Sequence, residues 1–215
     1  MKNKANKTVY CPLCEGNSAV FYQYKTRLYH QCKTCQGIFV DPSLMPSLDH
    51  EKLRYEEHHN DVNNKGYQKF VSPITNSILK NYKPTDKGLD FGAGTGPVIA
   101  KILKEQKYHI ELYDPFFHNF PDLLNQTYDY IACCEVIEHF HFPAKEFGLL
   151  KRILNNGGAL YCMTDIYDSS IDFHKWYYKN DMTHVFIYQK ETLEWIKKTY
   201  GFLKLTIKDR LVILN

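Results

Sequence analysis

The stretch that decides the fold is Leu89-Asp-Phe-Gly-Ala-Gly-Thr-Gly-Pro97, where three alternate glycines follow a short apolar run. Glycine has no Cβ, so a ligand can approach the backbone closely at such a turn. Proline is well tolerated in the first turn of a helix. We therefore predict a strand at 88–91, a glycine turn, and a helix over 97–106 whose first N–H groups are free to bind a ligand.

Two nucleotide-binding loops do not fit this stretch. A dinucleotide loop of the form G-x-G-x-x-G needs its third glycine where Pro97 stands, and a phosphate-binding loop needs Gly-Lys-Ser/Thr, which is absent. Asp90 at the end of the strand would repel a pyrophosphate, but it could pair with the ammonium group of an amino-acid moiety. A turn with a purely structural role is the alternative.

Short apolar strands alternate with amphipathic helices beyond this loop, and a closing antiparallel pair ends the chain. The expected strands are 109–113, 128–134, 159–163, 202–208 and 211–214, and the expected helices cover 147–154 and 190–200, with a turn at 155–158. This alternation predicts an α/β fold with a doubly wound sheet. In such sheets ligands bind at the carboxyl ends of the strands.

The loop resembles the glycine motif of class I S-adenosylmethionine-dependent methyltransferases, and the likeness extends from about residue 67 to 215. Asp114 stands where that family has an acid that holds the ribose hydroxyls. Tyr128-Asp-Tyr-Ile-Ala-Cys-Cys-Glu-Val-Ile-Glu-His139 resembles the family's fourth-strand motif. The resemblance implies a Rossmann-like methyltransferase sheet and S-adenosylmethionine as cofactor.

The resemblance also implies roles for individual residues around that cofactor. Asp90 would face the methionine amine, Asp114 would take the ribose hydroxyls, and Phe116 would pack near the adenine. The implied cofactor-binding residues are Asp90, Gly92, Ala93, Gly94, Gly96, Asp114, Pro115, Glu135 and His139. For His139 the alternative is a cap on the following helix.

One departure from the family concerns the segment between Asp114 and Asp129. It is too short for the usual helix and third strand. The acid that commonly contacts the adenine amine therefore has no clear counterpart, and Asp122 is only a candidate.

A long aromatic segment, 167–188, follows the fifth strand. The aromatic content of the whole chain, 15%, exceeds what core packing ordinarily needs and suggests that some of these rings bind a ligand. It resembles a methyltransferase subfamily with a Trp-Tyr…Asp-x-Thr-His loop, matched here by Trp176, Tyr177, Asp181, Thr183 and His184. We expect Tyr177, Asp181 and His184 to be catalytic, with His184 as a general base that Asp181 orients. The alternative is that Asp181 and His184 hydrogen-bond each other and the loop backbone, and so hold a lid in place.

Four cysteines near the start of the chain have the spacing of a zinc ribbon, Cys11-x2-Cys14-x17-Cys32-x2-Cys35. Four thiolates complete a tetrahedral Zn²⁺ site and leave no open position, so we expect a structural zinc ion. A redox dithiol needs only one such pair, in a thioredoxin-like context. The remaining cysteines, Cys133, Cys134 and Cys162, lie on expected strands and are predicted to be core residues.

Composition and charge exclude several classes of protein. The 215 residues include no apolar run near the ~20 that span a membrane, and the basic stretch 1–7 is not followed by the apolar region of a secretory signal. Seven cysteines then suggest a reducing compartment, so we expect a cytoplasmic protein without a membrane partner. A net charge of +3 is too small to demand a nucleic-acid partner.

These observations predict three parts: a zinc ribbon at 1–42, a helical linker or cap at 43–83, and a methyltransferase domain at 84–215. The expected activity is methyl transfer from S-adenosylmethionine to a small-molecule acceptor, such as a metabolite or a sugar-like compound. One alternative is an rRNA or tRNA methyltransferase that recognises RNA through the ribbon. The other is a degenerate module that binds the cofactor without transferring a methyl group.

Overall fold

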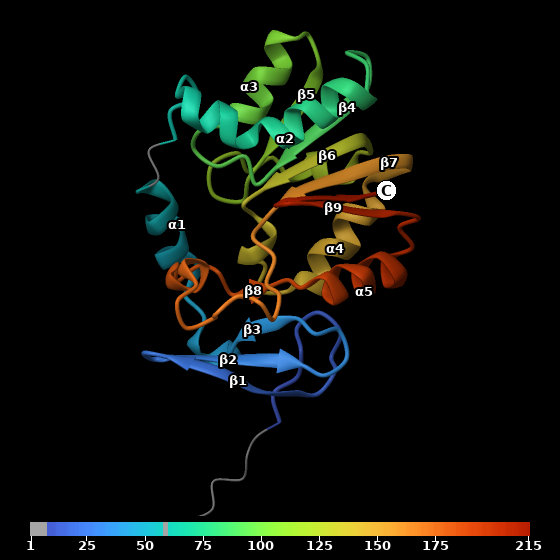
Figure 1. Cartoon of the computed structure of the whole chain (residues 1–215). Coiled ribbons are helices and arrows are strands. Elements are labelled where there is room, and N and C mark those ends of the chain that lie inside the picture. Colours follow the sequence, from blue (N-terminus) through green and yellow to red (C-terminus); the bar gives the residue numbers. More distant parts are fainter. Residues whose placement is uncertain (1–7, 58–59) are drawn as a thin grey trace, which may run out of the picture.

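The computed structural model describes residues 8–57 and 60–215. The basic stretch 1–7 lies outside the described residues. Figure 1 shows an α/β part above a smaller β-sheet formed near the N-terminus. Within the described ranges, none of the helices is long and apolar enough to cross a bilayer.

The central sheet has six strands in the order β5-β4-β6-β7-β10-β9. Their bounds are β4 Lys87–Phe91, β5 His109–Tyr113, β6 Tyr128–Cys134, β7 Leu154–Met163, β9 Leu205–Lys208 and β10 Leu211–Leu214. Strands β5, β4, β6 and β7 are parallel, whereas β10 pairs antiparallel with both β7 and β9. The predicted doubly wound α/β sheet and its closing antiparallel pair are therefore confirmed.

Helices cover both faces of this sheet (Figure 1). Their bounds are α2 Lys65–Asn81, α3 Val98–Glu105, α4 Pro143–Arg152 and α5 Lys190–Tyr200. Side chains alternate along β6, so that Tyr130 and Ala132 pack with α2 and α3, while Ile131 and Cys133 pack in the cluster that includes α4 and α5. Cys133 and Cys162 are core residues as predicted, but Cys134 is only partly buried.

Two predicted boundaries differ from the structure around β7. Helix α4 ends at Arg152, two residues before its predicted end, and the predicted turn 155–158 is part of the extended strand β7. The pairing with β6 steps from Tyr128↔Leu154 to Tyr130↔Ala159, so the four residues between form an irregularity in the ladder. Residues 155–158 therefore form a bulge within β7 and do not end the strand, because β7 resumes its pairing with β6 after them.

The shortened segment after β5 is also confirmed. Asp114 forms an isolated bridge with His118, and a single 3₁₀ turn, Pro121–Asn125, precedes β6. Among the described residues, β5 pairs with β4 and lies at the edge of the sheet. The chain thus goes directly from the second strand of the fold to its fourth.

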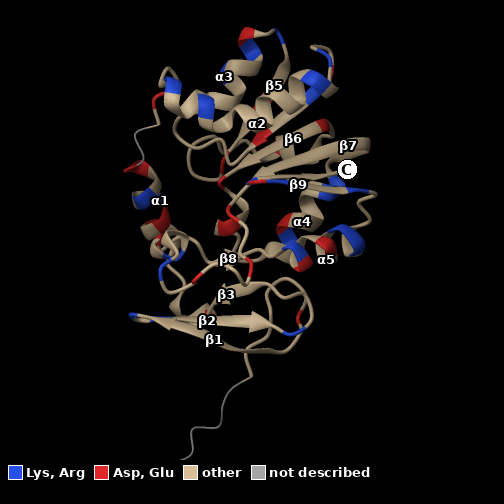
Figure 2. Ribbon diagram, viewed as in Figure 1, with Lys and Arg blue, Asp and Glu red and all other residues tan. Residues whose placement is uncertain are grey.

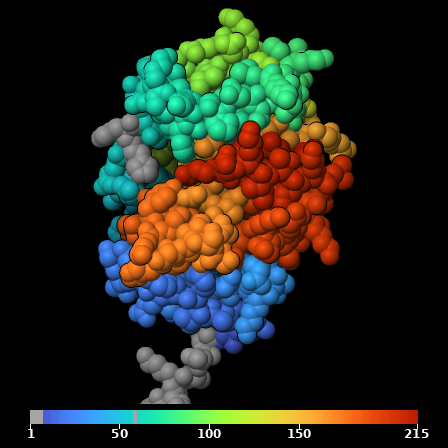
Figure 3. All heavy atoms as spheres, viewed as in Figure 1, coloured from blue at the N-terminus to red at the C-terminus, as the bar shows by residue number. Residues whose placement is uncertain are grey.

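The N-terminal sheet has the order β1-β2-β3-β8. Strands β1 Ser18–Tyr24, β2 Arg27–Cys32 and β3 Ile38–Val40 come from the cysteine region, and β1 and β2 pair as an antiparallel hairpin. Strand β8, Phe186–Ile187, comes from the aromatic segment and was not predicted. Figure 3 shows this segment, in orange, between the blue N-terminal part and the red C-terminal strands.

Helix α1, Leu48–Glu56, connects the N-terminal sheet to α2. Ser47 caps its start by accepting a hydrogen bond from the His50 amide, and Asn64 caps α2 in the same way through Tyr67. Both helices lie within 43–83, the range that the sequence analysis expects to be a helical linker or cap.

Gly88 in β4 permits a close contact that the sheet requires. A Cβ at this position would lie 2.1 Å from the ring of Tyr130, whose hydroxyl donates to the carbonyl oxygen of His109. We expect Gly88→Ala to lower the free energy of unfolding by about 1–3 kcal/mol, because the buried ring cannot be displaced without strain. Urea unfolding measures this change.

Gly148→Ala is the matched control. Gly148 lies inside α4, and a Cβ there would be 3.7 Å from the Tyr200 ring. The substitution should therefore leave the free energy of unfolding unchanged or raise it by up to about 1 kcal/mol. Equal unfolding free energies for Gly88→Ala and the unaltered protein would contradict the packing argument.

Candidate functional site

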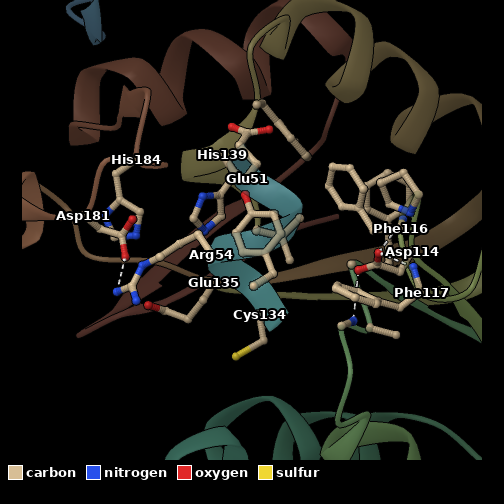
Figure 4. A pocket seen from close by; sticks show the side chains of 18 of the residues that line it. Glu51, Arg54, Asp114, Phe116, Phe117, Cys134, Glu135, His139, Asp181 and His184 are labelled. Atoms are coloured by element: carbon tan, nitrogen blue, oxygen red, sulfur yellow. Dashed lines mark hydrogen bonds and ion pairs between the residues drawn. The ribbon is translucent and has the colours of Figure 1, made fainter. Parts of the chain in front are cut away.

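A cavity of about 1130 Å³ opens at the carboxyl ends of β4, β5 and β6. Its walls come from the glycine loop, the segment after β5, the end of β6, helix α1 and the aromatic segment. Figure 4 shows Asp114 and two phenylalanines at one end, and Asp181 and His184 at the other. The sequence-predicted residues that line it are Gly92, Ala93, Gly94, Asp114, Pro115, Glu135, His139, Tyr177, Asp181 and His184.

The glycine loop and Asp114 form one hydrogen-bonded unit. Gly92 and Gly94 have φ angles of +80° and +60°, which favour glycine. The amide of Gly94 donates to Asp114 Oδ2 at 3.0 Å, and Asp114 Oδ1 accepts from the amides of Phe116 and Phe117 at 2.8 and 3.1 Å. A Cβ on Gly94 would meet nothing within 4 Å, so the backbone is accessible there to a ligand in the cavity.

Two predicted cofactor residues do not line the cavity. A Cβ at Gly96 would lie 2.0 Å from the carbonyl oxygen of Asn60, so this glycine allows the chain before α2 to pack on the loop. Asp90 is only 4% exposed at the end of β4. Burial raises the pKa of Asp90 to about 7, and the nearby Asp114 adds to the increase.

A group of buried and partly buried polar side chains lies at the end of β6. Glu135 accepts from Arg210 Nη2 at 2.5 Å, and Glu138 accepts from the Tyr178 hydroxyl at 2.5 Å. Burial and the neighbouring Glu138 raise the pKa of Glu135 above its ordinary value, while Arg210 opposes the increase. Burial likewise raises the pKa of Glu138 to about 7, opposed by its bond from Tyr178.

The aromatic segment is held by its own backbone and by a residue of the N-terminal sheet. Arg27 donates to the carbonyl oxygens of Asp181 and His184, both at 2.7 Å. His184 Nδ1 lies 2.8 Å from the carbonyl oxygen of Tyr178. The loop and the N-terminal sheet are thus joined by hydrogen bonds as well as by β8.

The structure differs from the expectation that Asp181 orients His184. Asp181 Oδ1 accepts from the amide and hydroxyl of Thr183 at 2.9 and 2.7 Å, and Oδ2 accepts from Arg54 at 3.2 Å. Although burial opposes them, the Thr183 bonds and the nearby Arg54 guanidinium hold the pKa of Asp181 well below its usual range. The backbone of Tyr178, not Asp181, orients the imidazole, which agrees with part of the alternative lid interpretation.

Burial, together with the neighbouring His139, lowers the pKa of His184 to about 3. The imidazole is therefore neutral near pH 7 and a weaker base than an ordinary histidine. The His139 and His184 rings lie 4.9 Å apart, centroid to centroid. His139 Nδ1 lies 2.9 Å from the carbonyl oxygen of Thr183, so its hydrogen bond goes to the loop and not to α4, whose cap residue is Phe142.

Sequence reasoning missed the wall contributed by helix α1. Glu51 accepts from His141 Nε2 at 2.7 Å, and Arg54 reaches Asp181 across the cavity (Figure 4). It also missed Tyr178 and Arg210, which both line the cavity. Helix α1 carries no motif, and nothing in the local sequence signals that these side chains converge, because the chain fold alone brings them together.

The four N-terminal cysteines form a compact cluster. The Cys11 and Cys35 sulfurs lie 3.6 Å apart, and those of Cys14 and Cys32 lie 3.3 Å apart. The amides of Leu13 and Thr34 point at the Cys11 and Cys32 sulfurs at 3.4 and 3.3 Å. A tetrahedral zinc ion with Zn–S bonds of ~2.3 Å separates its sulfurs by a little under ~4 Å, so the cluster fits such an ion.

The buried carboxyl of Asp90 makes stability depend on pH. In the unfolded chain an aspartate has a pKa of about 3.9, whereas Asp90 in the fold titrates at about 7. Between these values the folded state holds the extra proton, so this group's contribution to stability is lost as pH rises. We expect Asp90→Asn to gain stability relative to the unaltered protein between pH of about 5 and about 8, as measured by urea unfolding without ligands. A difference that is independent of pH would contradict the assignment.

Comparisons with known proteins bear on the fold and the family of this chain. A search of the curated proteins finds no match. Human N-acetylserotonin methyltransferase in complex with SAM has a TM-score of 0.54 and 11% identity, over 78% of this chain and 56% of that one. An O-methyltransferase family protein from Burkholderia thailandensis has a TM-score of 0.49 and 13% identity, over 68% and 55%. The chain thus spans a little over half the length of both structures.

The human enzyme supports the fold, since its TM-score exceeds 0.5, and identity this low supports nothing finer. The family comparison goes further. A family model described as a methyltransferase domain matches residues 55–207, which is well over half of the 215 residues. The chain therefore belongs to the methyltransferase-domain family of enzymes.

Proposed function

We propose that this chain transfers a methyl group from S-adenosylmethionine to a small-molecule acceptor. The observation that carries the proposal is the single cavity that joins the glycine loop to the aromatic segment. A donor held at one end and an acceptor at the other could align for in-line displacement at the sulfonium methyl. Positioning of this kind supplies most of the catalysis in such a transfer.

The cofactor end of the cavity has groups that fit the donor. Gly92, Ala93 and Gly94 line the cavity, and at Gly94 no atom lies within 4 Å of the place a Cβ would take. The Asp114 carboxylate has lone pairs beyond those that its amide donors use, and these would accept from the two ribose hydroxyls. Phe116 and Phe117 offer apolar faces beside it. When bound, the cofactor supplies an electrophilic methyl group. Asp90, beneath the loop, would add negative charge near the donor's ammonium group once it ionises.

The acceptor end is formed by Tyr177, Asp181 and His184 together with helix α1. Tyr177 is more exposed than the others, and its hydroxyl donates to Asp165 and accepts from Arg210. We assign these three residues to acceptor contacts. With a pKa of about 3, His184 would take up little of the acceptor's proton by itself, so its contribution is chiefly to hold the acceptor.

The surface of the N-terminal sheet favours a small acceptor over RNA. Figure 2 shows few Lys or Arg residues on β1, β2 and β3. Arg27 is one of two positive residues between the cysteine pairs, and its guanidinium donates to carbonyl oxygens of the aromatic segment. Binding to RNA phosphates needs an array of exposed positive charge and depends strongly on salt, and this sheet offers little of it.

We also propose that the four cysteines hold a structural zinc ion and that residues 1–42 form a ribbon around it. The sulfur spacing and the amides that point at Cys11 and Cys32 support this. The ion would fix β2 and β3, and through β8 and Arg27 it would fix the acceptor end of the cavity.

The proposed activity can be tested with labelled S-adenosylmethionine and a panel of small hydroxyl, amine and carbon acids. We expect His184→Ala to lower turnover at least ~100-fold, because the acceptor loses a contact that positions it, while calorimetry gives a cofactor affinity within about twofold of the unaltered protein. Asp114→Asn should weaken cofactor binding at least ~10-fold, because hydrogen bonds to a charged group are worth about 1.5–3 kcal/mol.

His174→Ala is the control, because His174 lies on the same segment but is exposed and bonded to Tyr22. It should keep both turnover and affinity. Loss of cofactor binding or of folding in His184→Ala would instead assign His184 to the structure of the loop. Absence of cofactor binding by the unaltered protein would overturn the proposed function.

Metal analysis tests the zinc proposal. We expect the purified protein to contain zinc, and Cys14→Ser combined with Cys32→Ser to lose one ion per chain and to change the near-UV circular dichroism of the aromatic segment. Cys162→Ser, at a buried cysteine of β7, should retain the ion. An unaltered protein without zinc, or a double variant with an unchanged metal content, would refute the proposal.

A further inference from the structure

Three side chains that could bind a metal ion converge behind the acceptor end of the cavity. Glu138 and His139 belong to the 3₁₀ turn Ile137–His139 after β6, and His184 belongs to the aromatic segment. Each offers one ligand atom, and these atoms all lie within 4.8 Å of one another. His139 and His184 line the cavity, and Glu138 is fully buried.

Hydrogen bonds fix the same tautomer in both histidines. His139 Nδ1 faces the carbonyl oxygen of Thr183 at 2.9 Å, and His184 Nδ1 faces that of Tyr178 at 2.8 Å. A carbonyl oxygen only accepts, so both Nδ1 atoms carry the proton and both Nε2 atoms keep a lone pair. Metal-binding histidines are commonly held in this way, by a backbone carbonyl on the other ring nitrogen.

Glu138 supplies an independent observation. Its Oε1 accepts from the Tyr178 hydroxyl, which also lies 2.9 Å from the hydroxyl of Thr164. Its Oε2 is buried and has no hydrogen-bond partner among the residues that the structure describes. Leaving a buried carboxylate oxygen without a partner is costly, and a cation beside it would remove that cost.

We propose that Glu138, His139 and His184 bind one divalent transition-metal ion at the acceptor end of the cavity. Two imidazoles and one carboxylate are a ligand set typical of sites that keep open positions, in contrast to the closed set of four thiolates. The backbone carbonyls of Thr183 and Tyr178 and the Tyr178 hydroxyl hold the ligands in place. If the proposed methyl transfer is correct, the open positions would bind the acceptor's oxygen or nitrogen and lower the pKa of that group, so that it loses its proton more readily.

Manganese(II) is a suitable probe, because its electron paramagnetic resonance signal falls on binding and soft thiolates bind it poorly. The full chain, with its zinc retained and without S-adenosylmethionine, is titrated with Mn²⁺. We expect one Mn²⁺ per chain, and at least ~10-fold weaker binding in Glu138→Gln and in His184→Gln. His141→Gln is the control, because His141 lines the same cavity but is paired with Glu51, and it should bind as tightly as the unaltered chain.

An unaltered chain that leaves the Mn²⁺ signal unchanged, or variants that bind as tightly as it does, would overturn the proposal. If circular dichroism shows that Glu138→Gln does not fold, His184→Gln decides. Calorimetry with S-adenosylmethionine on the same samples separates this proposal from the proposed function. Mn²⁺ binding without cofactor binding keeps the metal site and rejects the methyl transfer, and the reverse result rejects the metal site alone.

Discussion

The guanidinium of Arg27 is the contact on which the acceptor end of the cavity depends. It donates to the carbonyl oxygens of Asp181 and His184, in a loop that has no long strand or helix of its own. Five N–H donors in a rigid plane allow one arginine to fix two such carbonyls at once. The N-terminal sheet therefore helps to determine where His184 lies, although it contributes no side chain to the cavity wall.

A second constraint is the number of acids placed at the ends of the parallel strands. Asp90, Asp114 and Glu138 are all at most 7% exposed, and burial raises the pKa of Asp90 and Glu138. A fold does not keep such groups for stability, because ionising a buried carboxyl is unfavourable without a partner. Their arrangement is better explained by ligands, since perturbed carboxyls gather at functional sites.

The central sheet could be predicted because its signals are local. The apolar runs at 88–91, 109–113 and 128–134 have strand length, and the glycines of the loop specify a turn that few other residues allow. Strand β8 could not be predicted, because two residues, Phe186 and Ile187, gain their extended form only by pairing with β3. The turn expected at 155–158 failed for the same reason, since the neighbouring strand overrode the local preference.

Many residues of the candidate site could be predicted from the sequence, but the hydrogen bonds between them could not. The motifs identified Asp181 and His184, yet only the fold shows that Asp181 is bonded to Thr183 and Arg54 while a backbone carbonyl orients His184. Spacing along a chain shows which side chains can be neighbours. It does not show which of several donors an oxygen accepts from, nor that helix α1 completes the wall.

The pairing of β3 with β8 has a consequence for how the chain folds during synthesis. The two strands are separated by most of the sequence, including the whole parallel sheet. A newly made N-terminal sheet therefore has an unpaired edge at β3 until residues near position 187 emerge, and contacts this distant in sequence form slowly. The strands β1, β2 and β3 are thus made before the parallel sheet, but the sheet that they form can be completed only after it.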